Sequence, residues 1–520
     1  NRLKAALAIS AVIGAVAPAY SATNQYFLPY DVPTNGVKAK GLSVVNASDF
    51  TDIRQIEAPT QVVSSPLVHF AGTPNATSQT YSNPHPSSLV YAKAGHWFFV
   101  NLAASSTLKP ARISSESGAQ TVCNARIIDI DSSNPNAAWL LYQLPGTDAA
   151  CNTSDDQFRA AHLSDRGTVA PVTLSVTTLD DMYAVGDKYS LANSIVARDG
   201  TQVRMYNSAL TSSQVVLDGI ANDSWGTAYA TSDGNGEFIY VNGTLRELHD
   251  NGTLGNVVYT DPTGFGVQHF NNVDANNIYF LVHSFSSANT VKLYRVPRDG
   301  MSKSVLMYEG TVAAGADIDG QTTNTIILRL KNGATGQKLV AVSKTAVSGS
   351  PAPKVLETLT SGFIYFAAGN GGRVYYTTLT LSGSSYVSTA ISKGEGGAGL
   401  VSQGAGSQWV GLAVSSAKND GLLTYSYLAL LTGKTGNNLQ GATLSSFKLS
   451  DSTVTPLTTF TAPVLDSFAF AFGSTGLGGM VTDGDSGQGD VFAVDFAAGR
   501  YAQITDTPTV DEEVVSFDGG

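Results

Sequence analysis

The sequence predicts an all-β fold made of many short strands joined by tight turns. Its 520 residues include 52 glycines, 22 tyrosines and 21 phenylalanines, while charged residues make up only 14%. Tyrosine and phenylalanine favour strands, and glycine, asparagine and serine favour turns. Long surface helices would need more Glu, Lys and Arg than this chain has, since an ordinary soluble domain is about 25% charged.

A strand–turn–strand unit recurs along most of the chain. Its clearest copy has an alternating strand at Phe492–Phe496, a turn of small residues, and a second strand at Arg500–Ile504. Other copies turn at Asp199-Gly200, Asn242-Gly243 and Asp299-Gly300. Asn-Gly and Asp-Gly between alternating apolar runs are strong hairpin signals, because primed turns need positive φ at their centre.

The units recur at a spacing that suits a four-stranded sheet unit, or blade. The spacing is irregular but averages roughly 45–50 residues. Apolar runs that precede many of the hairpins, such as 277–281 and 362–366, are each expected to be the inner strand of a blade. The predicted strand pairs and single strands are 97–102 with 110–113, 194–197 with 202–206, 238–241 with 244–248, 292–296 with 305–308, and 339–342, 374–377 and 446–449.

This pattern resembles the exported bacterial β-propellers with degenerate, WD40-like or TolB-like blades. The resemblance covers residues 60–510 and implies a β-propeller of about eight four-stranded blades. The chain lacks the Gly-His…Trp-Asp signature and the Kelch double glycine, so no subfamily is specified. Tandem β-sandwiches are the competing fold. They would show a linker near the middle of the chain, and the sequence has none.

Three segments follow from this interpretation: a signal peptide at 1–22, an irregular lead-in at 23–60, and the propeller at 61–520. Arg2 and Lys4 precede the apolar stretch Ala5–Val16, as in secretory signals. That stretch is shorter than the ~20 residues that span a bilayer. We therefore expect an exported protein in the periplasm, at the cell surface or outside the cell, with no transmembrane span in the mature chain. If the segment is retained, it would serve as an anchoring or assembly helix.

Cysteine content and charge narrow the environment and the partners. Only two cysteines occur, Cys123 and Cys151, and an even count in an exported chain predicts a disulfide. The net charge is −11 and no basic run is present, which argues against nucleic acid as a partner.

No catalytic motif of high specificity is present, and one weak metal motif is. Asp483, Asp485 and Asp490 resemble the Asp-rich loops that hold calcium, the only cofactor that the sequence suggests. Gly487 stands where a further ligand would be expected. Asp129 and Asp131 begin a second weak cluster of the same kind. The seven histidines show no spacing typical of metal ligands.

Export, a disulfide and the lack of a catalytic signature favour a non-enzymatic binding or assembly module. Its partner would be a protein, a glycan or further copies of the chain, as in a surface layer or filament. The alternative is a secreted hydrolase or lyase that acts on a polysaccharide or ester from the propeller channel.

Six Asn-x-Ser/Thr triplets are potential glycan acceptors if the host glycosylates exported proteins. They begin at Asn46, Asn75, Asn152, Asn222, Asn242 and Asn251.

Overall fold

The computed structural model describes most of the chain between residues 24 and 514. The described residues are 24–30, 38–46, 49–75, 80–102, 108–113, 122–129, 138–165, 167, 169–176, 178–179, 182–185, 194–220, 225–231, 236–284, 289–312, 315–333, 335–370, 372–382, 385–395, 401–407, 412–419, 422–432, 441–448, 453–461, 477–482, 489–496, 498–504 and 511–514. All elements among them are strands, and within these ranges no helix is long and apolar enough to cross a membrane. The predicted signal peptide at 1–22 lies outside them.

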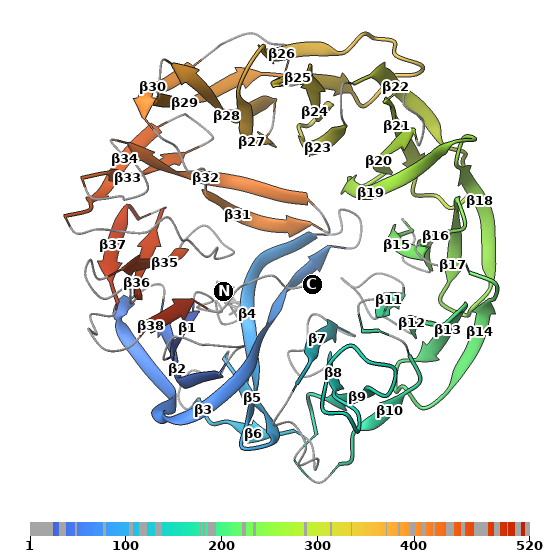
Figure 1. The fold of residues 1–520 in the computed structure, drawn as a ribbon, viewed down its shortest axis with the longest axis vertical. Coiled ribbons are helices and arrows are strands. Elements are labelled where there is room, and N and C mark those ends of the chain that lie inside the picture. The colour runs from blue at the N-terminus through green and yellow to red at the C-terminus, as the bar shows by residue number, and fades with distance from the viewer. Residues whose placement is uncertain are drawn as a thin grey trace, which may run out of the picture.

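The described strands form eight sheets that are arranged around a ring (Figure 1). Six of these sheets have four antiparallel strands each, in chain order from the centre of the ring to its rim. The all-β propeller predicted from the sequence is therefore confirmed. The six sheets are β7 (Asn124–Asp129), β8 (Ala138–Leu144), β9 (Gln157–His162), β10 (Val172–Leu174); β11 (Met182–Val185), β12 (Ser194–Asp199), β13 (Gln202–Asn207), β14 (Ser213–Leu217); β15 (Trp225–Ala230), β16 (Gly236–Val241), β17 (Thr244–His249), β18 (Leu254–Thr260); β19 (Phe265–Val273), β20 (Asn277–Ser284), β21 (Thr290–Pro297), β22 (Val305–Thr311); β23 (Ala316–Gln321), β24 (Thr325–Asn332), β25 (Gly336–Ser343), β26 (Lys354–Leu359); and β27 (Phe363–Asn370), β28 (Arg373–Ser382), β29 (Ser385–Gly394), β30 (Val401–Ser407).

The remaining strands complete the ring. One further sheet has three strands, and another joins eleven described strands, among them the four-stranded unit β31–β34. The three-stranded sheet is β35 (Leu477–Thr482), β36 (Gly489–Asp495) and β37 (Arg500–Gln503). The eleven-stranded sheet contains β1 (Asn24–Tyr30), β2 (Lys38–Asn46), β3 (Asp49–Asn75), β4 (Thr80–Lys93), β5 (His96–Asn101), β6 (Ala111–Arg112), β31 (Leu412–Asn419), β32 (Leu422–Thr432), β33 (Thr443–Lys448), β34 (Thr453–Thr459) and β38 (Asp511–Val514).

The expectation of an irregular lead-in at 23–60 was wrong, because β1, β2 and the first part of β3 lie there. Leu42 and Val44 are buried, and so are Gly41 and Ser43, so this part of β2 is covered on both faces. Pro29 is tolerated in β1, where it is paired in register with Glu512 of β38. The last described strand thus pairs antiparallel with the first, from Phe27 opposite Val514 to Tyr30 opposite Asp511.

Two long hairpins run toward the middle of the ring (Figure 1). One is β3–β4 and the other is β31–β32. Their ends meet where Asn419 of β31 pairs with Thr80 of β4. Strands of this chain therefore cross the region that would otherwise be the central channel.

The turns between second and third strands follow the chemistry that the sequence predicted. Asn242 and Gly243 have φ values of 48° and 78°, so both central residues of the β16–β17 turn are in the left-handed region. That combination defines the primed turn whose twist matches the flanking strands. The β12–β13 turn has Gly200 and Thr201 at its centre, because Asp199 pairs with Gln202, and Gly200 has a φ of 60°.

The hydrophobic core is divided among the interfaces between neighbouring blades. Ile239 and Val241 of one blade pack with Val196 and Val203 of the blade before it. Phe238 packs in the opposite direction, against the following blade. A second strand such as β20 is buried on both faces, which explains its continuous apolar run.

This burial also corrects one prediction about inner strands. Residues 277–281 belong to β20, the second strand of its sheet, whereas the innermost strand is the more polar β19. The other predicted inner strand, 362–366, does correspond to the innermost strand β27.

Three of the described turns between third and fourth strands tie their blades to the blade before. We call the turns at residues 250–253, 298–304 and 344–353 the rim turns. Gln214 of β14 donates to the carbonyl of Asn251 at 3.2 Å. Ser304 N–H donates to Val258 O of β18 at 2.9 Å, and Ser348 N–H donates to Leu306 O of β22 at 2.7 Å. The rim turns thereby occupy part of the outer strand edges that would otherwise be open to strand pairing.

Candidate functional site

The predicted calcium loop remains a prediction. Asp483 and Asp485 lie outside the described residues, and Asp490 lies in β36, where its side chain is not described. Asp129 ends β7 with an undescribed side chain, and Asp131 is outside the described part. Among the residues that are described, no group of three or more His, Cys, Asp or Glu side chains is arranged to hold a metal ion.

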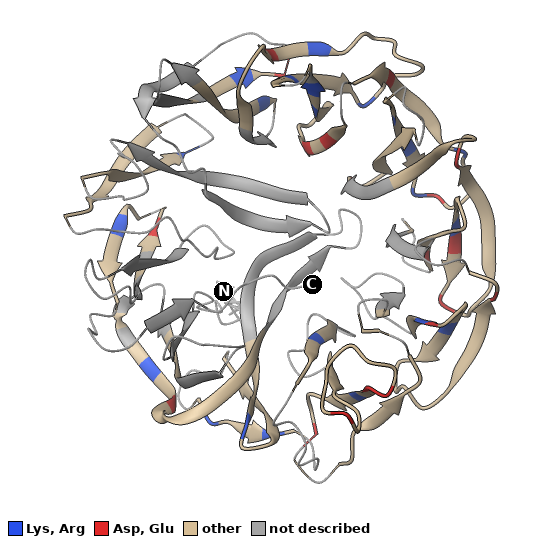
Figure 2. Ribbon diagram, viewed as in Figure 1, with Lys and Arg blue, Asp and Glu red and all other residues tan. Residues whose placement is uncertain are grey.

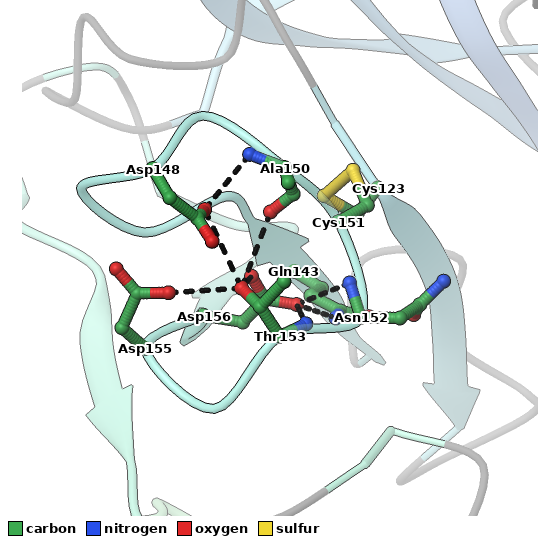
Figure 3. Close-up of a disulfide and its surroundings, with 9 residues drawn as sticks. All are labelled: Cys123, Gln143, Asp148, Ala150, Cys151, Asn152, Thr153, Asp155 and Asp156. Carbon is green, nitrogen blue, oxygen red and sulfur yellow. Dashed lines mark hydrogen bonds between the residues drawn. A yellow bond between two sulfur atoms is a disulfide. The ribbon is translucent and has the colours of Figure 1, made fainter.

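The predicted disulfide is present. Cys123 and Cys151 are bonded, with their Cα atoms 5.4 Å apart (Figure 3). Cys123 precedes β7 and Cys151 lies in the loop between β8 and β9, so the bond joins two segments of one blade. Its position ties the loop at 145–156 to the start of the innermost strand.

The disulfide-bonded loop carries Asp148, Asp155 and Asp156, and each of these carboxylates accepts hydrogen bonds from other residues of the loop. Asp155 accepts from the N–H and hydroxyl of Thr147, at 2.6 and 2.7 Å, and from the hydroxyl of Thr153 at 2.8 Å. These bonds, led by the Thr147 hydroxyl, lower the pKa of Asp155 to about 2. Asp156 accepts from Asn152 N–H at 2.7 Å and from the Gln143 side chain. These hydrogen bonds stabilise the ionised carboxylates, and the carboxylates in turn fix the conformation of the loop.

A second carboxylate cluster lies on β23, the innermost strand of its blade. Figure 2 shows acidic positions on this strand, which lies on the inner side of its blade. Asp317 is opposite Arg329 of β24, and the register shifts between Ile318 and Gly320, which leaves Asp319 at a β-bulge. Bulges re-aim side chains and are common beside functional sites.

Arg329 holds this cluster together and joins two blades. Its guanidinium lies 3.1 Å from Asp319 Oδ1 and 3.4 Å from Asp317 Oδ2. It also donates to Ile364 O of β27, in the next blade, at 3.1 Å. We call Asp317, Asp319 and Arg329 the inner-strand cluster.

Asp319 has the most unusual environment of these three side chains. It is 10% exposed, whereas Asp317 is 59% exposed. Asp319 Oδ2 and Arg329 Nε are buried and have no hydrogen-bond partner among the described residues. Burial raises the pKa of Asp319 to about 7. Arg329 opposes this shift, and the nearby Asp317 charge adds to it. A carboxyl group of that pKa can give or take a proton near neutral pH.

A polar network at one end of the same blades connects three of them. Asp274, after β19, lies 3.2 Å from Lys344 Nζ and accepts from the Tyr279 hydroxyl at 2.7 Å. Burial alone would raise the pKa of Asp274, but Lys344 and Tyr279 lower it. Glu395, after β29, accepts from Asn324 at 2.7 Å and from the Thr322 hydroxyl. These contacts join turns of neighbouring blades. The carboxylates of Asp274 and Glu395 bond to groups within the network.

A serine–histidine pair lies at hydrogen-bonding distance in the described part of the blade that holds the disulfide. His162 Nδ1 and Ser164 Oγ are 2.6 Å apart at the end of β9. Ser164 is exposed, and Asp165 accepts from the backbone N–H of His162 at 3.3 Å. Desolvation lowers the pKa of His162, which packs edge-on against Trp139. This arrangement is a local surface turn, without the enclosed setting that a nucleophilic serine needs.

The sequence predicted the disulfide but not the inner-strand cluster. The available signal was the segment Asp317-Ile318-Asp319-Gly320, in which two acidic residues alternate with an apolar one before a glycine. Period-2 alternation puts both carboxylates on one face of a strand. The counter-charge, Arg329, comes from the next strand and could be paired only once the register was known.

Comparison with known proteins adds little to this description. No protein-family model and no curated protein matches the chain. Among solved structures, a eukaryotic initiation factor matches 92% of this chain and 96% of its own, with a TM-score of 0.44 and 11% identity. Dipeptidyl peptidase 4 of Porphyromonas gingivalis matches 82% of this chain and 64% of its own, at 0.41 and 10%. An oligogalacturonate lyase in complex with manganese matches 58% and 85%, at 0.33 and 12%. At these scores and identities, no activity is carried over to this protein.

Proposed function

We propose that the protein is an exported, non-enzymatic propeller that binds a protein or glycan partner or assembles with copies of itself. One observation carries the proposal. The β3–β4 and β31–β32 hairpins meet at Thr80 and Asn419, so the chain itself crosses the centre of the ring. Ligand sites are usually concave, and in a propeller the natural concavity is the central channel. A partner would therefore contact the outer faces of the ring.

Two further features support an exported binding module. The disulfide between Cys123 and Cys151 suits an oxidising compartment. The low charged fraction of 14% leaves few like charges to oppose close packing between copies. Both features suit a subunit of a surface layer or filament at the cell surface.

Electron microscopy and size-exclusion chromatography of native material test this proposal. Ordered sheets or fibres, or a stable complex with another macromolecule, are the expected result. A monodisperse monomer at high protein concentration, with no partner co-purifying, would contradict it. Mass spectrometry of the same sample shows whether residues 1–22 have been removed.

The inner-strand cluster favours a hydrolase or lyase as the second candidate function. Asp319 would act as the acid or base, because its pKa lies near neutrality, and the exposed Asp317 would contact substrate. The test is turnover of a panel of neutral and acidic polysaccharides and a nitrophenyl ester by the wild type and by Asp319→Asn. Turnover that disappears in the variant while the fold is retained would establish this alternative over the binding module.

A further inference from the structure

Two identical Asn-Gly-Thr triplets lie in one blade and differ in how their side chains are bonded. Residues 242–244 form the turn between β16 and β17, and residues 251–253 form the rim turn between β17 and β18. Both asparagines are exposed. The pair therefore compares one acceptor sequence in two structural settings.

In the first triplet the amide nitrogen is already engaged. Asn242 Nδ2 donates to Gly219 O at 3.3 Å, which binds the side chain to the preceding blade. The hydroxyl of Thr244 donates to Val241 O at 2.8 Å and is thus directed at the strand backbone. Exposure of Asn242 does not by itself present its amide nitrogen for reaction.

In the second triplet the amide oxygen is engaged in place of the amide nitrogen. Asn251 Oδ1 accepts both the N–H of Thr253, at 2.9 Å, and its hydroxyl, at 2.7 Å. Because the carboxamide is planar, fixing its oxygen toward Thr253 turns Nδ2 away from the turn. Hydrogen bonds to the amide oxygen also draw electron density from the nitrogen and make its proton easier to lose.

The backbone around Asn251 is fixed as well. The Asn251 carbonyl accepts from Gln214 of the preceding blade at 3.2 Å. Gly252 has a φ of 85°, and a Cβ at this position would lie 2.1 Å from Gln214 Nε2. The positive φ strongly favours glycine here, and a larger residue would also displace the end of the Gln214 side chain that bonds to Asn251 O.

We propose that Asn251 is a site of N-glycosylation and that Asn242, with the same triplet, is not. The donor would be a lipid-linked glycosyl diphosphate. A bond forms between Asn251 Nδ2 and the anomeric carbon, the bond from that carbon to the phosphate oxygen breaks, and the amide proton leaves to a base of the transferring enzyme. The inference rests on export, the first part of the proposed function, since such donors act outside the cytoplasm.

Glycopeptide mapping by mass spectrometry of the protein from its source tests this inference. We expect the peptide with Asn251 to carry glycan at several-fold higher occupancy than the peptide with Asn242. No glycan at Asn251, equal occupancy at both positions, or glycan at Asn242 alone would overturn the inference. The N-terminal peptide in the same map shows independently whether the chain was exported, so failure at this site and failure of export are distinguishable.

Matched variants of the full chain, secreted from a host that glycosylates, sharpen the test. Asn251→Gln should remove the mass of one glycan, whereas Asn242→Gln should leave the glycan mass unchanged. Thr253→Ser keeps the hydroxyl and should retain the modification, and Thr253→Val should lose it. Loss of glycan in Asn242→Gln but not in Asn251→Gln would contradict the assignment, provided that both variants elute as the wild type does.

Discussion

The disulfide-bonded loop and the innermost strand β23 both place aspartates close together, with opposite results. In the loop, hydroxyl and N–H donors surround Asp155 and lower its pKa to about 2. On β23, burial raises the pKa of Asp319 to about 7. Two threonine hydroxyls and a backbone N–H bond to Asp155, whereas Asp319 is buried with its Oδ2 unbonded among the described residues. The same residue type therefore stabilises a turn in one region and titrates near neutrality in the other.

Removing the disulfide is the strongest way to break this comparison. Changing both Cys123 and Cys151 to serine should lower the free energy of unfolding by about 3–4 kcal/mol on the chain-entropy estimate for a loop of this length. The sequence separation is 28 residues. Thermal unfolding followed by circular dichroism measures the effect. An unchanged midpoint would show that the hydrogen bonds of the loop suffice without the covalent bond.

Removing the counter-charge of the inner-strand cluster tests the other region. Arg329→Met leaves Asp319 buried without its partner and should destabilise the fold by about 3 kcal/mol at pH 8, where Asp319 is mostly ionised, as breaking a buried ion pair does. Arg198→Met is the control, because it removes the same charge from a partly exposed side chain that bonds to Gly200 O in the turn between β12 and β13. Equal shifts of the unfolding midpoint in the two variants would contradict a special role for Arg329.

The pH dependence of Asp319→Asn sharpens the contrast. Because the folded pKa is about 7 and the unfolded pKa is about 4, the unfolded chain loses this proton first as the pH rises. The carboxyl therefore lowers stability progressively between about pH 4 and pH 7. The variant should match the wild type near pH 4 and exceed its unfolding midpoint at pH 8. A midpoint difference independent of pH would refute this interpretation.

Asp155→Asn should show the smallest effect, with the opposite sign. The lowered pKa of Asp155 means that the ionised group stabilises the fold above about pH 4, and this contribution is lost as the pH falls toward 2. The variant should therefore unfold at a slightly lower temperature than the wild type at pH 7, and the two should converge near pH 2. Scans across that range are the measurement. A gap that widens on acidification would contradict the assignment.

Much of the fold was predictable because local signals determine hairpins. Asn242-Gly243 forms the expected turn, and the strands flanking it lie where alternation predicted. The turn predicted at Asp199-Gly200 is centred one residue later, on Gly200 and Thr201. The prolines and glycines of residues 23–60 suggested loops, so the strands there were not predicted. Leu42 and Val44 are in fact buried residues of β2. The hairpins that cross the centre were not predictable, since the contact of Thr80 with Asn419 joins residues far apart in the chain.

The candidate sites depended even more on tertiary structure. The Cys123–Cys151 bond followed from an even cysteine count, because two cysteines allow only one pairing. The cluster of Asp317, Asp319 and Arg329 depends on strand register and on contact with the next blade. Neither can be predicted from a single sequence. The aspartates at 483–490 resembled a metal site more than Asp317 and Asp319 did, because three of them lie close together in the sequence.

The pairing of β1 with β38 has a mechanical consequence. Because these strands are antiparallel, with Phe27 opposite Val514, the two free ends of the pair lie at the same end. A tensile load applied between the two ends of the chain would separate the pair one residue at a time, beginning at Phe27, instead of shearing all of its bonds together. Copies joined under tension are therefore better connected through the faces of the ring than through their termini.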